Sequence, residues 1–307
     1  MRWWFKATIQ KGISILPGGR TLHHFLQRKV WRSLKISEPF LIDRLSHVTK
    51  HLNAWEKHHA NNLPDKALEL GTGWYPIVPV GLFLSGLDQV YTVDQNRYFN
   101  MPCFAELMTW LQDWHEDGLL KKHLPSLKHT RWEQLLRTYQ QHQSNFTALL
   151  EALNIQYWVG DARTLPYPDD HFSLIHSNNT FEHIPPKTLS ALLAEMNRVL
   201  KVKGCMSHYI DMADHYSYGD PNLSPFHYLR FTERQWHWIE NRFQSQNRLR
   251  INQYEDIYAE LGLENQRLEV ELGTPSQLAA VKLASPFKDF PAENLSVLYA
   301  QLVSYKK

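Results

Sequence analysis

The chain has 307 residues, of which 43% are hydrophobic and 13% aromatic, so it can bury a full core and a disordered class is excluded. The longest apolar runs, such as residues 77–84, fall short of the eighteen or more that cross a bilayer, and the two cysteines are too far apart for a disulfide framework or a cysteine zinc site. Lys6, Gln10 and Lys11 interrupt the apolar stretch that a secretion signal would need, so we expect a cytoplasmic protein.

Charge is unevenly distributed, although the formal net charge is only +2. Residues 1–50 hold ten Lys or Arg and two acids, whereas the rest of the chain holds 23 basic and 29 acidic residues. Such a split is most often a solvated helical face, and otherwise a segment that meets an anionic partner or membrane surface. A peripheral contact through residues 1–50 is therefore the second expectation for localisation.

The predicted elements begin with helices, because apolar residues recur at helical spacing over residues 1–60. Strands follow in "LPDKALELG" and "GLDQVYTVDQN", and helical spacing then extends from about residue 96 to 153 with a break at Pro125. We therefore divide the chain into an N-terminal helical cap, residues 1–60, and a main domain, residues 61–307, with a helical insertion at about 96–153.

The second half of the chain alternates between strands and helices. Strands are predicted in "IQYWVGD" and "HFSLIHSN", and a helix from Pro186 to Lys201 leads into the strand "CMSHYIDM". "NQRLEVELG" and "ENLSVLYAQLVSYK" close the chain as a pair of strands. This order predicts the α/β class with a doubly wound, mostly parallel sheet, to which the last pair adds an antiparallel edge.

The stretch "LELGTGWYPIVPV" carries a glycine turn directly after the first strand. In an open parallel sheet, ligands gather at the carboxyl ends of the strands. A dinucleotide site would need a third glycine three residues after Gly73, where this chain has Pro76, which also lacks the amide that a phosphate would bind. The turn thus favours a cofactor held without phosphate contacts.

Three acids accompany the turn. Glu69 lies two residues before Gly71, Asp94 ends the second strand, where an acid can accept both hydroxyls of a ribose, and Asp161 ends the third, where a carboxylate can hold an exocyclic amine. Each residue alone can also be a simple turn or a helix cap. Their joint order indicates an adenosine bound through ribose and amine.

The motifs "LELGTG", Asp94, "GDARTLPYPDDHFSLIHSNNTFEHIP" and "LLAEMNRVLKVKGCM" stand in the order seen in the class I S-adenosylmethionine-dependent methyltransferases, which this chain resembles over residues 66–94 and 157–212. The resemblance implies a seven-stranded Rossmann-like fold and S-adenosylmethionine as cofactor. It places Glu69, Gly71 and Gly73 at the methionine moiety, Asp94 at the ribose, Asp161 with Ala162 at the adenine, and Asn178 near the sulfonium. Pro76 and the long helical insertion depart from the family pattern.

Several residues are candidates for binding the methyl acceptor or for removing its proton. His215 is the first candidate for a general base because it follows the fifth strand, and His183 and Asp211 are the others. A metal set of Asp211, Asp214, His215, Asp220 and His227 has irregular spacing, so we predict no metal. Candidate substrate-binding residues lie in the aromatic segment that follows the fifth strand: Tyr216, Tyr218 and Arg230.

The predicted function is methyl transfer to a small molecule, with oxygen as the acceptor atom. No basic groove with interleaved aromatics runs through the catalytic half, which argues against nucleic acid as a partner. The alternatives are an S-adenosylmethionine-binding enzyme of another reaction type, such as a cyclisation or rearrangement, or a non-catalytic cofactor-binding protein that docks through its basic N-terminus. A nicotinamide-dependent oxidoreductase is a more distant alternative.

Overall fold

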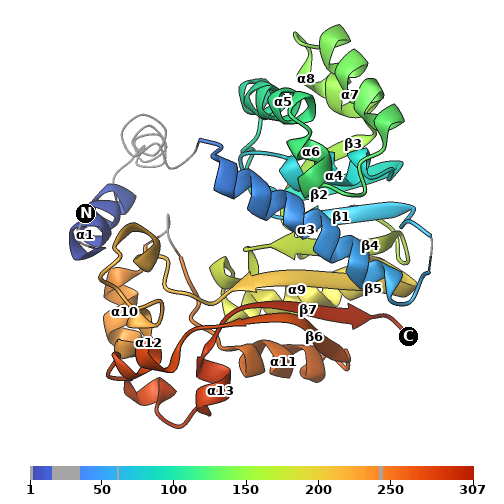
Figure 1. The fold of residues 1–307 in the computed structure, drawn as a ribbon. Coiled ribbons are helices and arrows are strands. Elements are labelled where there is room, and N and C mark those ends of the chain that lie inside the picture. Colours follow the sequence, from blue (N-terminus) through green and yellow to red (C-terminus); the bar gives the residue numbers. More distant parts are fainter. Residues whose placement is uncertain (1–2, 16–34, 61, 242–244) are drawn as a thin grey trace. The chain divides into compact units, whose positions relative to one another are not determined.

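The computed structural model describes residues 3–15, 35–60, 62–241 and 245–307, and Figure 1 shows how its elements are arranged. The first half of the chain contains α1 (Trp3–Ile15), α3 (Glu38–Glu56), β1 (Lys66–Leu70), α4 (Ile77–Leu84), β2 (Gln89–Asp94), α5 (Met101–Glu116), α6 (Leu119–His123), α7 (His129–Gln141), α8 (Phe146–Ala152) and β3 (Ile155–Val159). The second half contains β4 (Phe172–Asn178), α9 (Pro186–Val199), β5 (Leu200–Asp211), α10 (Glu233–Ile239), α11 (Ile251–Glu260), β6 (Asn265–Leu272), α12 (Pro275–Ala279), α13 (Ala292–Leu295) and β7 (Val297–Tyr305). The helix predicted around residues 21–34 lies outside the described residues.

The seven strands form one sheet in the order β3-β2-β1-β4-β5-β7-β6. The β1 strand is parallel to β2 and β4, β3 is parallel to β2, and β5 is parallel to β4. The β7 strand runs antiparallel to β5. Main-chain hydrogen bonds from the Lys203 amide to the Lys306 carbonyl and from the Met212 amide to the Leu298 carbonyl show this direction. The predicted α/β fold with a mostly parallel seven-stranded sheet and an antiparallel addition is confirmed.

The chain divides into two compact units. The large unit comprises residues Ile36–Asn178, Ala191–Tyr209 and Val303–Lys307, and the small unit comprises Met1–Lys35, Asn179–Ser190 and Ile210–Leu302. The division differs in outline from the predicted helical cap and main domain, since α1 belongs to the small unit and α3 to the large one.

The core of the large unit is built on its central strands. Every residue of β4 is buried, as expected for a parallel strand with neighbours on both sides. The α3 helix crosses in front of β1 and β4 in Figure 1 and presents a buried apolar face that includes Leu45 and Val48. A Cβ added at Gly81 of α4 would lie 2.6 Å from a methyl carbon of Val48, so glycine permits the close approach of these two helices.

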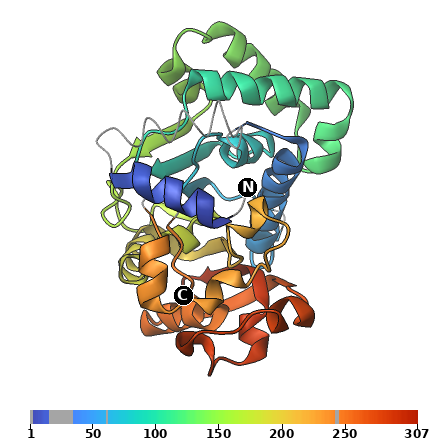
Figure 2. The same cartoon turned by 90° about the vertical axis from the view of Figure 1, so that its left-hand side faces the viewer.

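The predicted helical insertion contains α5 to α8, which appear as the green group of helices in Figure 2. The Asn100 side chain accepts a hydrogen bond from the Cys103 amide at the start of α5, and Asn145 accepts one from the Ala148 amide at the start of α8. The predicted break at Pro125 falls between α6 and α7.

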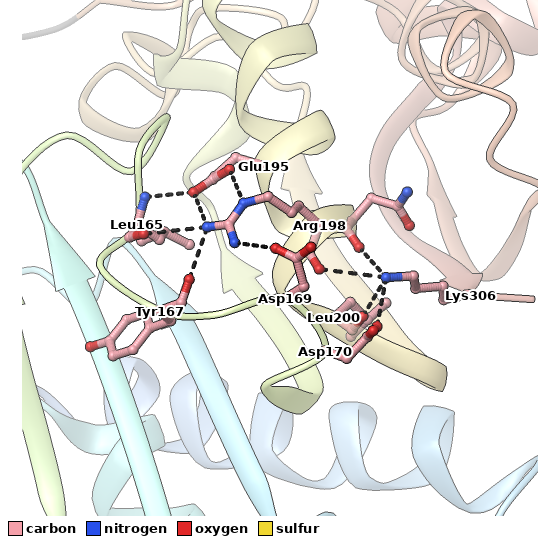
Figure 3. Close-up of polar contacts among 9 residues, drawn as sticks. Leu165, Tyr167, Asp169, Asp170, Glu195, Arg198, Leu200 and Lys306 are labelled. Carbon is pink, nitrogen blue, oxygen red and sulfur yellow. Dashed lines mark hydrogen bonds and ion pairs between the residues drawn. The ribbon is translucent and has the colours of Figure 1, made fainter.

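An arginine near the end of α9 fixes the loop that leads into β4 (Figure 3). Arg198 donates hydrogen bonds to both carboxylate oxygens of Glu195, to Asp169, and to the main-chain carbonyls of Leu165 and Tyr167, at 2.6–3.3 Å. Lys306 lies beside this network and donates to Asp170 at 2.9 Å. The guanidinium offers several donors in one plane, so this single side chain fixes the loop before β4 to the end of α9.

The small unit has its own core. It contains an apolar cluster of buried residues around Phe226, Tyr228 and Trp236. Arg250 is fully buried, and its guanidinium donates to the carbonyls of Met212 and Leu295 at 2.7 and 2.8 Å, so main-chain acceptors surround the charge. Among the helices that the structure describes, none has both the length and the apolar character needed to span a bilayer.

Candidate active site

The glycine turn after β1 leaves a bare stretch of backbone. Gly71 and Gly73 have φ values of 80° and 72°, in the left-handed region that favours glycine. The Gly71 amide donates to the carbonyl of Val93 at 2.8 Å, which ties the turn to β2. A Cβ added at Gly73 would meet no atom within 4 Å, so the space over this residue is open to a ligand.

Two buried carboxyl groups border the turn. Glu69 and Asp94 are 3% and 5% exposed, and the Asp94 carboxylate oxygens lie 3.2 and 3.4 Å from the Gly73 amide, which donates to them. Burial, together with the charge of Glu69, raises the pKa of Asp94 to about 8, and burial raises the pKa of Glu69 to about 7. A cationic ligand beside the two groups would favour their ionised forms.

A directional chain of hydrogen bonds holds Glu69 in place. Thr72 donates to one carboxylate oxygen of Glu69 at 2.6 Å, and the Asn178 amide nitrogen donates to the other at 3.0 Å. The Asn178 oxygen must then accept, so His51 donates from Nε2 at 2.8 Å. His51 Nδ1 in turn accepts from the Ser207 hydroxyl at 2.8 Å, which completes a chain from β5 through α3 and β4 to β1.

His51 belongs to a group of four buried histidines that sequence reasoning did not connect to the site: His47, His51, His176 and His208. Burial lowers the pKa of each, to about 4 for His51 and about 3 for His208, so all four are neutral at pH 7. His51 and Asn178 are 127 residues apart in the chain, and only the packing of α3 on β4 reveals their contact.

The predicted adenine residues lie just after β3. Asp161 is exposed and forms an ion pair with Arg163, whose side-chain nitrogens lie 2.5–3.0 Å from its carboxylate oxygens. The same carboxylate accepts from the Arg163 amide at 3.0 Å, and these bonds lower the pKa of Asp161 to about 2. Ala162 is 8% exposed. The assignment of both residues to the adenine stays a prediction.

The three predicted candidates for acid–base chemistry come together in the small unit. His215 Nε2 lies 3.2 Å from the Asp211 carboxylate, and the rings of His183 and His215 are 5.0 Å apart. Tyr218 donates to Asp211 at 2.5 Å and also contacts the hydroxyl of Tyr299. Sequence reasoning therefore selected a set of side chains that meet, although their spacing along the chain is irregular.

Glu182 belongs to the same cluster and was missed. One ligand atom from each of Glu182, His183 and His215 lies within 4.8 Å of the others, and the Glu182 side chain is 2% exposed. The stretch "FEHIP" displayed this acid next to His183, but sequence alone gave no reason to prefer it over the chain's other acids.

The other predicted substrate-side residues have mixed surroundings. Tyr216 is buried in the apolar cluster of the small unit, which favours a packing role, whereas Arg230 is exposed and lies over the ring of Phe231. The metal set weighed from sequence splits into separate pairs: His227 lies 3.1 Å from Asp214, while His215 lies by Asp211.

Three of the basic residues within 1–50 are engaged inside their own unit. Lys11 donates to the carbonyl of Glu240 at 2.7 Å, Arg44 lies 3.7 Å from Asp43, and Lys50 lies over the ring of Tyr209. Of these contacts, only the ion pair between Arg44 and Asp43 sets a negative charge against a positive one. Peripheral membrane contact stays a prediction.

Comparison with known families matches part of the chain. A family model described as a methyltransferase domain matches residues 133–204, from α7 to the start of β5. This match covers 72 of the 307 residues and supports the predicted resemblance to the class I S-adenosylmethionine-dependent methyltransferases. No curated protein matches it in sequence.

The solved structures that are similar to this chain are distant from it in sequence. The YcgJ protein of Bacillus subtilis is 14% identical, with 84% of this chain and 99% of that one covered and a TM-score of 0.43. An S-adenosylmethionine-dependent methyltransferase of Methanosarcina mazei is 14% identical, with 81% and 96% covered and a TM-score of 0.44. A geranyl diphosphate methyltransferase is 13% identical, with 88% and 92% covered and a TM-score of 0.43.

The residues at the glycine turn fit S-adenosylmethionine. The cofactor carries a sulfonium and an ammonium, and the turn offers two buried carboxyl groups whose raised pKa values call for positive charge. Asp94 has acceptor oxygens for ribose hydroxyls, and the open space over Gly73 admits a ligand close to the backbone. Glu69, Gly71, Gly73, Asp94 and Asn178 are accordingly the residues that we expect to hold it.

Proposed function

We propose that this protein is an S-adenosylmethionine-dependent methyltransferase that transfers a methyl group to a hydroxyl oxygen of a small molecule. The observation that supports an oxygen acceptor is the pairing of His215 with Asp211, at 3.2 Å. A hydroxyl is a poor nucleophile until it loses its proton, and an imidazole oriented by a carboxylate is a common base for that step. Amine acceptors need less help, because an unprotonated amine already carries a nucleophilic lone pair.

Cofactor binding and removal of the acceptor's proton are assigned to separate sets of residues. Bound S-adenosylmethionine supplies a methyl group activated by its positive sulfur. With the cofactor bound, the acceptor oxygen would form its bond to the methyl carbon as the methyl–sulfur bond breaks, and the bonding electrons would remain on sulfur in a neutral thioether. The hydroxyl proton passes to the ring nitrogen of His215 that faces away from Asp211, while Tyr218 holds that carboxylate.

A small acceptor is supported by the character of the segment that carries these residues. Tyr218 and Tyr299 share a hydroxyl contact of 2.6 Å, and the His215 ring stacks on Tyr218 at 5.5 Å. Aromatic walls with a few convergent polar groups are typical of sites for partly apolar small ligands.

The test is an acceptor screen with purified full-length protein. Release of S-adenosylhomocysteine would be measured with phenols, sugars, hydroxy acids, amines and a carbon nucleophile, and products would be identified by mass. We expect turnover with a hydroxyl compound and a product heavier by one methylene unit. Methylation of amines alone would refute the oxygen acceptor, and a product formed without S-adenosylhomocysteine would indicate a cyclisation or rearrangement.

A further inference from the structure

We propose that Glu182, His183 and His215 bind a divalent transition-metal ion of the zinc type. This inference goes beyond the proposed methyl transfer, and it differs from the sequence prediction of no metal. Among the described residues these three are the group whose ligand atoms gather within 4.8 Å of one another. The sequence could not select them, because two neighbouring residues and a third one 32 positions later form no regular spacing.

The donor types indicate the class of metal. Two imidazoles and one carboxylate are a frequent ligand set for zinc in sites that keep one position open. Imidazole suits zinc and its neighbours in the first transition row better than magnesium or calcium, which prefer oxygen ligands. The Glu182 side chain is only 2% exposed, and a buried carboxylate favours a cation beside it.

The surroundings of both histidines are an independent observation. A histidine that binds a metal normally donates its other ring N–H to a carbonyl or carboxylate, which fixes the tautomer. His183 Nδ1 donates to the carbonyl of Ser245 at 2.6 Å, so Nε2 presents its lone pair. His215 Nε2 lies 3.2 Å from the Asp211 carboxylate but makes no hydrogen bond among the described residues, so this buried nitrogen has no hydrogen-bonding use in the structure.

The separations are close to those of an assembled site. Ligand atoms about 2.1 Å from a tetrahedral ion lie about 3.4 Å from each other, so small side-chain rotations would complete the coordination. His183 Nε2 lies 4.0 Å from a Glu182 oxygen and the His183 side chain is 43% exposed, which gives an ion a route from solvent.

A bound ion would change the role of His215. It would occupy the lone pair that a general base needs, and the ion itself would then favour loss of the proton from an acceptor hydroxyl. Metal binding would therefore replace His215 as the base, while methyl transfer to a hydroxyl would still stand. A chain that binds no metal but still methylates would overturn this inference and leave the proposed function in place.

The test is a metal titration of the full-length chain after chelator treatment. Zn²⁺ would be followed by calorimetry against a competing indicator, and Co²⁺ by its visible absorption, which reports the ligands directly. We expect one ion per chain, a loss of about 100-fold or more in affinity in the His183→Ala/His215→Ala double variant, and about 10-fold in Asp211→Asn. His129→Ala is the matched control, because His129 is 74% exposed and lies outside the cluster.

Three outcomes would overturn the proposal: no stoichiometric binding, binding that survives the double variant, or binding that is lost equally in the control. The chain has 17 histidines, so the last two identify adventitious sites. Circular dichroism and thermal melts of each variant establish that it is folded. Glu182→Gln provides a further variant, since it removes a ligand charge while keeping the size of the buried side chain.

Discussion

The glycine turn and the histidine–carboxylate cluster of Glu182, His183, Asp211 and His215 both contain acids and histidines. The two sites differ in how far their side chains are buried and held by hydrogen bonds. At the turn, Glu69 and His51 are almost fully buried, and hydrogen bonds of 2.8 and 3.0 Å connect them through Asn178. In the cluster, the His183 side chain is 43% exposed, and His215 lies 3.2 Å from Asp211.

This difference teaches how binding and chemistry are distributed. A ligand that is always the same favours rigid, prearranged partners, because each immobilised group lowers the entropy cost of binding. A site that binds a methyl acceptor, takes up a proton or binds an ion needs side chains that can still rotate and change protonation state. The buried chain is therefore expected to control cofactor affinity, and the cluster to control turnover.

The largest expected effect is on turnover. We predict that His215→Ala lowers kcat by about 100-fold, because the acceptor loses the group that takes its proton. The measurement is S-adenosylhomocysteine release under saturating cofactor, with cofactor affinity measured separately by calorimetry. His129→Ala should behave as the wild type. Full activity of His215→Ala would transfer the role to His183 or Asp211, or show that no base is needed.

The next largest expected effect is on cofactor affinity, through the acid proposed to bind the ribose. Asp94→Ala is expected to weaken S-adenosylhomocysteine binding by about 1–3 kcal/mol, because a buried carboxylate that accepts hydrogen bonds is removed. Calorimetry at one pH measures the affinity of each protein for S-adenosylhomocysteine. The affinity of Asp94→Asn should lie between those of Asp94→Ala and the wild type, because asparagine keeps an acceptor oxygen. An unchanged affinity would contradict the ribose assignment.

A smaller effect tests His51 as a positioning residue. His51→Ala removes the donor to Asn178, so the amide that holds Glu69 loses its orientation. We expect the KM for S-adenosylmethionine to rise about 10-fold while kcat changes little. His47→Ala is the matched control, since His47 is equally buried one turn earlier on α3. An equal rise of KM in both variants would indicate general destabilisation only.

The smallest effect is on stability as a function of pH. The raised pKa values of Glu69 and Asp94 mean that the folded chain keeps protons that the unfolded chain releases, so the free energy of unfolding of the cofactor-free protein falls as pH rises toward 8. The buried histidines act oppositely. Their lowered pKa values give stability above pH 6.5 that is lost as pH falls below it.

Stability should therefore be greatest near pH 6.5, with a decline on the order of 1 kcal/mol by pH 8.5. Urea unfolding at several pH values measures this curve. The Glu69→Gln/Asp94→Asn double variant should lose the decline above pH 6.5 and keep the one below it. A curve that keeps both arms in the double variant would show that other groups titrate.

Much of the frame of this protein could be predicted from local patterns. The strand segments β1 and β4, the proline that opens α9 and the glycine turn after β1 follow from residue type and backbone preference, which act over a few positions. Glu69 and Asp94 were identified at strand ends for the same reason, since parallel strands bring their carboxyl ends to one edge.

What sequence could not supply depends on contacts between distant segments. By itself the sequence determined the α/β class and the position of the glycine turn, because periodicity and turn residues act over a few positions. The cofactor contacts and the candidate bases stay predictions. Only the tertiary structure decided that His51 reaches Asn178 from α3 and that Glu182 joins His183 and His215. Such contacts depend on helix packing and on where loops return, and no spacing along the chain encodes the distance between two side chains that a fold brings together.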